Sequence, residues 1–256
     1  MKVVVDGGAL AHPETGIGRY TGELLRALSD LEEAGTDLEL QVFFNAWRAS
    51  RPPATYDDPR FRLVNPRLPS RLLRAAWDRL GLLPAERFCG AVDLFHASDW
   101  IHPPLRSAAL VATVHDLGPL DHPEWYAPDV VAVHRRINQG VARRAAAILT
   151  VSDFTRRRFA ERFDVPLERI HVTYNGVAPT FGPLAPEVGR REAEALGIRR
   201  PFVLYVGSRE RRKNVLGLVE IFARVAEAEP ELDLVVVGMR PDREGLRGQG
   251  ARAWEG

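Results

Sequence analysis

The sequence predicts an α/β protein with a parallel sheet, and three observations support this fold class. Short apolar runs of strand length alternate along the chain with longer segments whose apolar residues recur at helical spacing. Several of the short runs, such as residues 109–114 and 202–206, are apolar at nearly every position, which is typical of strands buried on both faces. Polar or glycine-containing stretches separate the runs from the helical segments. Strands that alternate with helices predict βαβ units with right-handed connections.

The first 178 residues contain the larger set of these elements. The expected strands lie at residues 3–5, 38–44, 61–64, 92–96, 109–114, 147–151 and 170–173. Helices are expected after Gly18, at 130–147 and at 153–163, where Ser152 is a natural N-cap. Residues 70–88 form a further helical stretch that is broken near Gly81 and Pro84. We therefore predict one Rossmann-like domain over residues 1–178.

The rest of the chain predicts a second domain that is incomplete. Residues 179–199 begin with clustered prolines and glycines and are interpreted as a linker. Residues 200–256 hold two expected strands, 202–206 and 232–237, around a helix at 215–229, and then turn polar. Independent sheets usually need three or more strands. This segment is therefore interpreted as the start of a domain that either is incomplete or docks on the first.

Composition excludes several classes of protein. The 256 residues are 45% hydrophobic and 27% charged, with a net charge of +1, which disfavours bulk attraction to nucleic acid. Cys89 is the single cysteine, and the histidines show no ligand spacing, so neither a disulfide framework nor a metal site is expected. The N-terminal apolar run is too short for a signal peptide, and no run is long enough to span a membrane. A cytoplasmic protein is expected.

A basic loop between the strand at 202–206 and the helix that follows is the strongest candidate ligand site. It contains Arg209, Arg211, Arg212 and Lys213, and Asn214 is expected to be the N-cap of the helix. Free N–H groups and the helix dipole make such a point of an α/β sheet suitable for an anion such as phosphate. The alternative is a solvated basic turn, since runs of charge usually lie on solvated faces.

Glycines before the first helix form a second candidate. Gly16 and Gly18 resemble part of a dinucleotide fingerprint, but Thr21 occupies the third glycine position and Asn45, not an acidic residue, follows the second strand. A nicotinamide-binding site is therefore disfavoured. The two glycines suit a flexible loop that closes over a phosphate or sugar, and they equally suit ordinary turns.

Two strand ends carry a histidine and an acid. His115 and Asp116 follow the strand at 109–114, at the edge where open α/β sheets bind ligands, and His96 with Asp99 forms a similar, weaker pair. His115 could donate a hydrogen bond to a sugar hydroxyl or a phosphate oxygen, with Asp116 orienting the ring. The alternative is a histidine whose hydrogen bonds are satisfied within its own loop.

Arginines alternate with large apolar residues in the stretch at 70–88. This pattern is compatible with a basic amphipathic face that contacts anionic lipid. The alternative is a helix that packs on its own sheet while its arginines extend to solvent. The residues concerned are Arg71, Leu72, Leu73, Arg74, Trp77, Arg79, Leu80, Leu83 and Arg87.

Taken together, these motifs resemble family 4 of the retaining glycosyltransferases, which have the GT-B fold, and especially its mannosyltransferase-like members. The resemblance runs from the first residues to about Gly238. Its order and spacing are more specific than any one motif. The matching segments are TGIGRYT at 15–21, VDLFH at 92–96, TVHDL at 113–117, VSDFTRR at 151–157, YNGV at 174–177, YVGSRERRKN at 205–214 and LVVVG at 234–238.

The resemblance implies a first, acceptor-side domain and a second domain that binds a nucleotide diphosphate sugar, linked to GDP or UDP, with no other cofactor. It implies that Gly16 and Gly18 approach the donor phosphate and sugar, and that His115, beside Asp116, contacts the donor sugar. The basic loop would hold the diphosphate through Lys213, Arg212 and Arg209. The implied reaction transfers a hexose, with mannose as one candidate, to a saccharide or lipid-linked acceptor in cell-surface polysaccharide assembly.

Two departures from the family pattern leave alternatives open. Ser208 replaces the arginine that many members place after the loop glycine, and the later motif with two glutamates is missing. A truncated or frame-shifted member, or half of a split enzyme with a complementing C-terminal chain, is therefore expected. The alternative function is a non-catalytic module that binds an acceptor or a partner. A peripheral contact with the inner membrane face is also left open.

Overall fold

The first unit of the protein, residues 1–178, is built on a parallel sheet. The computed structural model describes residues 1–47, 51–100, 102–178, 180–208 and 210–238, and it divides the chain into two units at residues 178 and 179. Within the described part of unit 1, seven strands lie in the order β3-β2-β1-β4-β5-β6-β7, and each pair is parallel. The strands are β1 (Lys2–Asp6), β2 (Glu39–Phe43), β3 (Leu63–Val64), β4 (Leu94–Ala97), β5 (Ala109–Val114), β6 (Ala147–Thr150) and β7 (Ile170–Val172).

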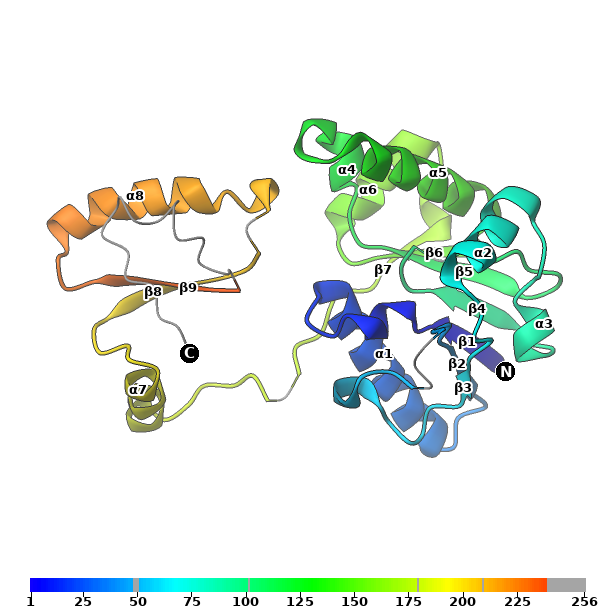
Figure 1. Ribbon diagram of the computed structural model, residues 1–256, viewed down its shortest axis with the longest axis horizontal. Coiled ribbons are helices and arrows are strands. Elements are labelled where there is room, and N and C mark those ends of the chain that lie inside the picture. Colours follow the sequence, from blue (N-terminus) through cyan, green and yellow to red (C-terminus); the bar gives the residue numbers. More distant parts are fainter. Residues whose placement is uncertain (48–50, 101, 179, 209, 239–256) are drawn as a thin grey trace. The chain divides into compact units, whose positions relative to one another are not determined.

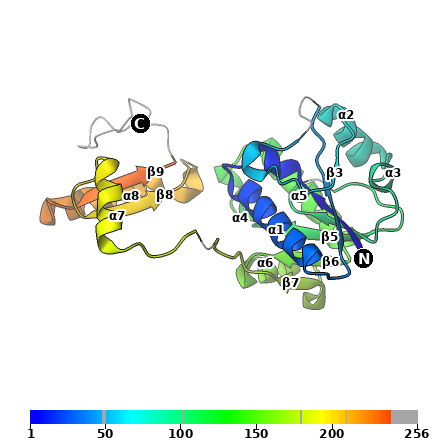
Figure 2. The ribbon, with the colours of Figure 1, turned by 90° about the horizontal axis from the view of Figure 1, so that it is seen from below.

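Helices cover both faces of this sheet (Figures 1 and 2). Alternate residues of a strand point to opposite faces, so Val4 belongs to one core and Val3 with Val5 to the other. The first core also contains residues of α2, α4, α5 and α6, and the second contains Leu25 of α1. The helices are α1 (Gly16–Glu33), α2 (Ser70–Ala75), α3 (Glu86–Cys89), α4 (Gly118–Asp121), α5 (Pro128–Arg144) and α6 (Asp153–Phe163).

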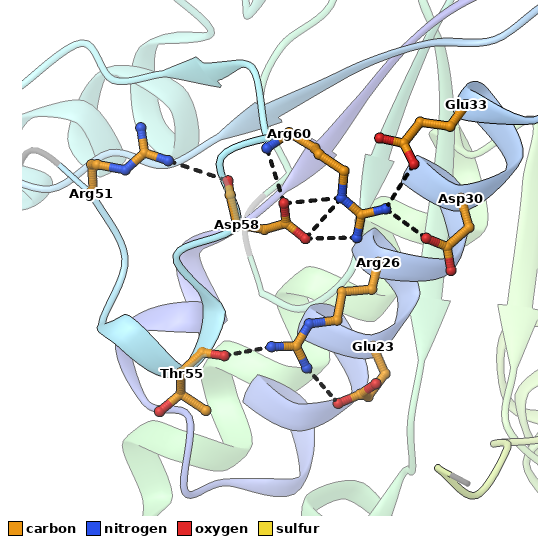
Figure 3. A network of polar contacts seen from close by, with 8 residues as sticks. All are labelled: Glu23, Arg26, Asp30, Glu33, Arg51, Thr55, Asp58 and Arg60. Carbon is orange, nitrogen blue, oxygen red and sulfur yellow. Dashed lines mark hydrogen bonds and ion pairs between the residues drawn. The ribbon is translucent and has the colours of Figure 1, made fainter.

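An ionic network fixes the segment at 51–60 against α1 (Figure 3). The Arg60 guanidinium pairs with Asp58 of its own segment and with Asp30 and Glu33 of α1. Arg26 of α1 donates to the main-chain oxygen of Thr55. The same segment supplies Tyr56, whose ring lies so close to Gly22 that a Cβ there would come within 2.1 Å of it. Helix α1 is therefore held from both sides, by the sheet and by this segment.

Most of the predicted elements lie where the sequence places them. Strand β5 and helix α6 have the expected bounds, and the Ser152 hydroxyl caps α6 by accepting a hydrogen bond from the Thr155 N–H. The stretch at 70–88 differs in detail, because α2 continues into a π-helical turn, η3 (Ala76–Leu80), and α3 follows a break at Gly81, whose φ is +61°. The broken helix expected there is thus three short elements.

The second unit begins at residue 179 and contains a smaller sheet. Helix α7 (Pro186–Ala195) lies within the range 179–199, which was predicted to be a linker. Strands β8 (Phe202–Val206) and β9 (Asp233–Val237) are parallel, and α8 (Val215–Ala228) runs along them (Figure 1). The prediction that 202–206 is buried on both faces is wrong, since Leu204 is 54% exposed and Val206 68%. Two strands and one helix cannot cover both faces of this sheet.

The start of α8 also differs from expectation. Asn214 precedes the helix, but its side chain makes no capping hydrogen bond, and its φ of +48° places it in the left-handed region. Asparagine tolerates that conformation better than most residues. The short 3-10 turn η6 (Arg211–Lys213) ends at Asn214, so the residue turns the chain from η6 into α8. No described helix combines the length and apolar character that crossing a membrane requires.

Candidate functional site

Polar side chains gather in unit 1 at the carboxyl ends of β1, β4 and β5, which are neighbours in the sheet. Asp6 ends β1, Ser98 follows β4, and His115 follows β5. Hydrogen bonds join these three strand ends directly. The Ser98 hydroxyl donates to the main-chain oxygen of Asp6 at 2.7 Å, and Nε2 of His115 lies 2.9 Å from the main-chain oxygen of Ser98. The sheet thus presents one connected polar cluster at the edge where open α/β sheets bind ligands.

The position of His115 fixes its tautomer. A carbonyl oxygen only accepts hydrogen bonds, so Nε2 must carry the proton that it donates to Ser98. Burial lowers the pKa of His115, although this hydrogen bond and the charge of Asp116 act in the opposite direction. The ring is therefore neutral at pH 7, with Nδ1 as a hydrogen-bond acceptor. A neutral His115 can accept a hydrogen bond from a ligand hydroxyl at Nδ1.

Asp116 does not orient the His115 ring by a hydrogen bond, contrary to the prediction. Its carboxylate Oδ1 instead accepts from the Gly118 N–H at 2.9 Å, which stabilises the turn into α4, and the side chain is exposed. The ring of His115 is oriented by Ser98 and by Tyr20, whose ring meets it edge-on at 4.8 Å between centroids. Asp116 acts on His115 only through its charge.

Tyr20 connects the cluster to helix α1. Its hydroxyl lies 3.1 Å from Oγ1 of Thr113, which in turn lies 2.8 Å from Nε2 of His96. Burial lowers the pKa of His96 to about 4, so this histidine is neutral and serves as a packed hydrogen-bonding residue. The second candidate pair, His96 and Asp99, is consequently not a paired dyad: His96 bonds to Thr113.

Two acidic residues belong to this edge, the buried Asp6 and the partly buried Asp99. Burial raises the pKa of Asp6 from 3.8 to about 7, although a hydrogen bond from the Gly8 N–H lowers it. Burial also raises the pKa of Asp99 to about 6. Oδ2 of Asp6 and Oδ1 of Asp99 are buried without a hydrogen-bond partner. Asp6, Ser98, Thr113 and Tyr20 were not among the predicted site residues. The available signal was position: Asp6 directly follows the predicted strand at 3–5, Ser98 lies two residues after the one at 92–96, and Thr113 is the next-to-last residue of the one at 109–114.

The two candidate glycines differ in their surroundings. Gly18 is buried, its N–H donates to the Thr15 hydroxyl at 3.0 Å, and a Cβ there would lie 2.2 Å from the His12 main-chain oxygen. Gly16 is exposed at the first position of α1, and a Cβ there would meet no atom within 4 Å. Close packing therefore accounts for Gly18. Gly16 lies open at the helix N-terminus, where anions are favoured.

The basic loop of unit 2 is partly neutralised by a residue within it. Glu210 accepts hydrogen bonds from the Ser208 hydroxyl at 2.6 Å and from Nε of Arg212 at 2.7 Å. Lys213 is exposed and forms no salt bridge with any described residue, while Arg209 lies outside the described residues. Of the three predicted phosphate contacts, Lys213 is the one described without a salt bridge, although its charge also helps to lower the pKa of Glu210. The described residues hold no group of three or more His, Cys, Asp or Glu side chains arranged for a metal ion.

Known proteins similar to this chain agree with the fold and the motifs. The chain is 28% identical over 255 residues to the O-antigen chain mannosyltransferase B of Escherichia coli, a match that covers 94% of this chain and 65% of that protein. The protein therefore spans slightly less than two thirds of the length of this relative.

Solved structures give the same fold. HepE from Anabaena, in complex with UDP and glucose, matches with a TM-score of 0.63 at 15% identity, over 94% of this chain and 62% of HepE. WaaG, a glycosyltransferase involved in lipopolysaccharide biosynthesis, matches with a TM-score of 0.64 at 17% identity, over 94% of this chain and 64% of WaaG. The family model of glycosyltransferase family 4 matches residues 15–181, which include the whole cluster around His115 except Asp6. Since this match spans more than half of the chain, the protein belongs to glycosyltransferase family 4 and has a GT-B type fold.

Proposed function

We propose that the protein transfers a hexose, with retention, from a GDP- or UDP-linked sugar to a saccharide or lipid-linked acceptor. The observation that carries this proposal is the polar edge around His115, which lies inside the segment matched by the family model. The mannosyltransferase relative supports mannose as the hexose and cell-surface polysaccharide assembly as the pathway. The complexes of HepE with UDP support a uridine donor as the alternative to a guanosine donor.

His115 is assigned to the donor sugar and Lys213 to the diphosphate. A neutral His115 whose Nε2 is held by Ser98 presents Nδ1 to a sugar hydroxyl. The departing nucleoside diphosphate accumulates negative charge, and cations fixed beside it stabilise the transition state. Lys213 and Arg212 supply such cations, with Arg209 as a third, and the open N-terminus of α1 at Gly16 favours an anion. Asp116 keeps a supporting role through its charge.

Calorimetric titration of the purified protein with GDP and with UDP tests the diphosphate assignment. We expect binding that weakens about 10-fold in Lys213→Ala, because one charge-assisted contact is lost. Lys2→Ala is the matched control, since Lys2 is the other of the two lysines in the chain and is also exposed. If Lys213→Ala binds either nucleotide as tightly as the unchanged protein does, the assignment is wrong.

Transfer kinetics with GDP-mannose and UDP-glucose test the assignment of His115. We expect His115→Ala to lower kcat by about 10²-fold, because a group placed against the reacting sugar acts mainly in the transition state. The exposed His171 provides a control substitution that removes a histidine from the edge strand β7. Absence of any transfer by the unchanged protein, with either donor, would refute the proposed activity.

We further infer a peripheral membrane contact at the cytoplasmic face, made by the segment at 70–88. Leu73 and Trp77 pack into the core, as the alternative interpretation predicted, but Leu72 and Leu80 are 67% and 65% exposed. Arg71 and Arg87 flank these leucines, which suits a surface of anionic lipid. Sedimentation with vesicles of phosphatidylglycerol and of phosphatidylcholine tests this. Equal binding to both, or no loss in Leu72→Ser with Leu80→Ser, contradicts the inference.

A second candidate function is a non-catalytic module that binds an acceptor and is completed by a partner chain. The exposed apolar side chains of β8 favour it, because an apolar face that lies open in one chain is suited to packing against another chain. Mixing the protein with a polypeptide equivalent to the C-terminal part of the mannosyltransferase relative tests this candidate. Association that restores transfer indicates a complementing chain, whereas transfer by the protein alone excludes the non-catalytic role.

A further inference from the structure

Unit 1 contains a small pocket that none of the proposed donor contacts uses. Its volume is about 60 Å³, and it lies between α2 with η3, the segment after β4 and helix α5. Two arginines and two tryptophans contribute to its wall, together with a histidine and two aliphatic side chains. The lining residues are Arg74, Trp77, Trp100, His102, Val133, Arg136 and Ile137.

The pocket combines positive charge with an apolar wall. Arg74 comes from α2 and Arg136 from α5, so two elements bring guanidinium groups to one place. Arg74 forms no hydrogen bond or salt bridge with any described residue, although its charge lowers the pKa of the nearby Asp6 and Asp99. Burial lowers the pKa of His102 to about 4, so this lining residue is neutral. The formal charge of the lining side chains at pH 7 is therefore positive.

The aromatic wall is fixed in place. The Trp77 indole N–H donates to the main-chain oxygen of Leu83 at 2.8 Å, and its ring packs against Phe43 in the core. Trp77 therefore offers the pocket an apolar surface and no free donor. Trp100 lies edge-on against His134 at 4.3 Å between ring centroids. Preorganised rings next to guanidinium groups suit a ligand that carries both an anion and an apolar or sugar face.

The size of the pocket limits what can enter it. One water needs about 10–15 Å³ of such volume, so 60 Å³ holds roughly five waters. A pocket of this size admits a group of a few atoms, such as a phosphate, since pockets that enclose a whole small ligand measure roughly 300–1,000 Å³. The ligand must therefore place a compact anionic group inside and the rest of its structure outside.

The pocket adjoins the polar edge of the sheet within the same unit. Trp100 directly follows Asp99, which is one of the two acidic residues of that edge. The contact partner of Trp100, His134, lies near enough to Asp116 for its pKa to respond to that charge. A molecule with its anionic group in the pocket can therefore extend toward the strand ends that carry His115.

We propose that this pocket binds the phosphate of a phosphorylated acceptor, with Arg74 and Arg136 as the phosphate ligands and Trp77 and Trp100 as the apolar wall. The proposal rests on the proposed transferase function and names its acceptor class. Guanidinium groups recognise phosphate oxygens through paired, charge-assisted hydrogen bonds. Phosphate is the chemistry shared by two sources, a soluble sugar phosphate and a lipid-linked phosphate. The two sources are separated by experiment.

Calorimetric titration of the full chain, without any nucleotide sugar, tests the pocket. The probes are glucose 1-phosphate, neutral glucose, and farnesyl phosphate in detergent micelles. The test variant is Arg74→Gln with Arg136→Gln, and the matched control is Arg135→Gln with Arg143→Gln, which removes two exposed arginines of α5 outside the pocket. We expect the test variant to bind the phosphate probes at least about 10-fold more weakly, while the control binds them normally.

Each outcome has a defined consequence. Binding of glucose 1-phosphate but not glucose, lost in the test variant, supports the pocket, and tighter binding of farnesyl phosphate assigns it to lipid-linked acceptors. No binding of either phosphate probe, or equal loss in test and control variants, overturns it. Unfolding temperatures of both variants exclude a loss of structure. If the protein transfers sugar and the KM for the acceptor is unchanged in the test variant, the assignment of the pocket to the acceptor phosphate is wrong. If the protein binds phosphate but transfers no sugar, the proposed transferase function is refuted and the phosphate pocket is not.

Discussion

Strands β5 and β8 are built from similar apolar sequence, yet their surroundings differ. Leu110 of β5 is 4% exposed, because β4 and β6 flank its strand and helices cover the sheet. Leu204 of β8 is 54% exposed, because only β9 pairs with its strand among the described residues. Both runs have the composition of a fully buried parallel strand. An apolar run therefore specifies a strand, whereas the number of layers around it decides how much of its surface leaves water.

The same difference extends to the polar groups of the two units. In unit 1, the carboxyl group of Asp6 is fully buried and its pKa is raised to about 7. In unit 2, Glu210 is exposed, and hydrogen bonds from Ser208 and then from Arg212 lower its pKa. Burial penalises the charged form, whereas hydrogen bonding to a carboxylate favours it. The first unit thus carries perturbed, inward-facing groups, and the second carries solvated charges suited to direct contact with an anion.

The largest expected effect comes from truncating the same residue type in the two sheets. We expect Leu110→Ala to lower the free energy of unfolding of unit 1 by about 2–5 kcal/mol, since it leaves a cavity in a closed core. Leu204→Ala should cost less than about 1 kcal/mol, because much of that side chain is already in water. Urea unfolding followed by tryptophan fluorescence, to which Trp77 and Trp100 of unit 1 contribute, measures the effect of Leu110→Ala.

Hydrogen exchange of peptides from β8 and β9 measures the effect of Leu204→Ala on unit 2. The unchanged protein should show weaker protection in these two strands than in β4 and β5, since local stability follows burial. A loss for Leu204→Ala as large as that for Leu110→Ala would show that β8 is covered in solution by a surface outside the described residues. That result would favour a complementing chain or an association between copies.

The second effect is a difference between Asp6 of unit 1 and Glu210 of unit 2 in how each makes the free energy of unfolding depend on pH. The pKa of Asp6 rises from 3.8 to about 7 on folding, so between these values the folded state holds a proton that the unfolded state has lost. Stability from this group therefore falls as pH rises from about 4 to 7 and stays constant above. Each pH unit corresponds to about 1.4 kcal/mol, and we expect Asp6→Asn to stabilise the protein by roughly 2–4 kcal/mol at pH 8 and little at pH 4.

Glu210→Gln is the corresponding substitution in unit 2, and its effect on the free energy of unfolding should have the opposite sign. Glu210 has a lowered pKa, so it contributes stability above the pKa of the unfolded state, and this contribution is lost on acidification. The exposed group should contribute less than about 1 kcal/mol after solvent screening. Thermal unfolding from pH 4 to pH 8 measures both variants. A pH-independent gain in Asp6→Asn would mean that the carboxyl group is already charged in the folded protein.

The sequence predicted the strands and helices well because their apolar periods are regular. Strand β5, helix α6 and strand β8 have the predicted bounds. Local rules failed where backbone conformation depends on neighbours. The stretch at 70–88 breaks at Gly81, as predicted, but α2 runs into the unpredicted π-helical turn η3, and Asn214 adopts a left-handed turn where capping by its side chain was expected. Neither conformation leaves a periodic signal.

The site was predicted in its location but not in its bonding. His115 was selected because it follows a strand, and topology places that strand end beside Asp6 and Ser98. The ring is oriented by the main-chain oxygen of Ser98, and the identity of a residue does not indicate which main-chain oxygens are near a histidine. The prediction chose the adjacent carboxylate of Asp116, which instead accepts a hydrogen bond from the Gly118 N–H. Long-range partners of this kind depend on the register between strands. Sequence patterns alone do not fix that register.

The smallest of the three effects separates the two predicted glycines of the α1 loop. Gly18→Ala would place a Cβ 2.2 Å from the His12 main-chain oxygen and 2.9 Å from that of Ala9, so the backbone must move, at a cost of about 1–3 kcal/mol. Gly16→Ala meets no neighbour and should change stability by less than about 0.5 kcal/mol. Thermal unfolding ranks the two variants. Because Gly16→Ala preserves the fold, any loss of nucleotide sugar binding in that variant reports contact at the helix N-terminus. A destabilised Gly16→Ala would instead place Gly16 with Gly18 among the residues that the packing of the loop requires.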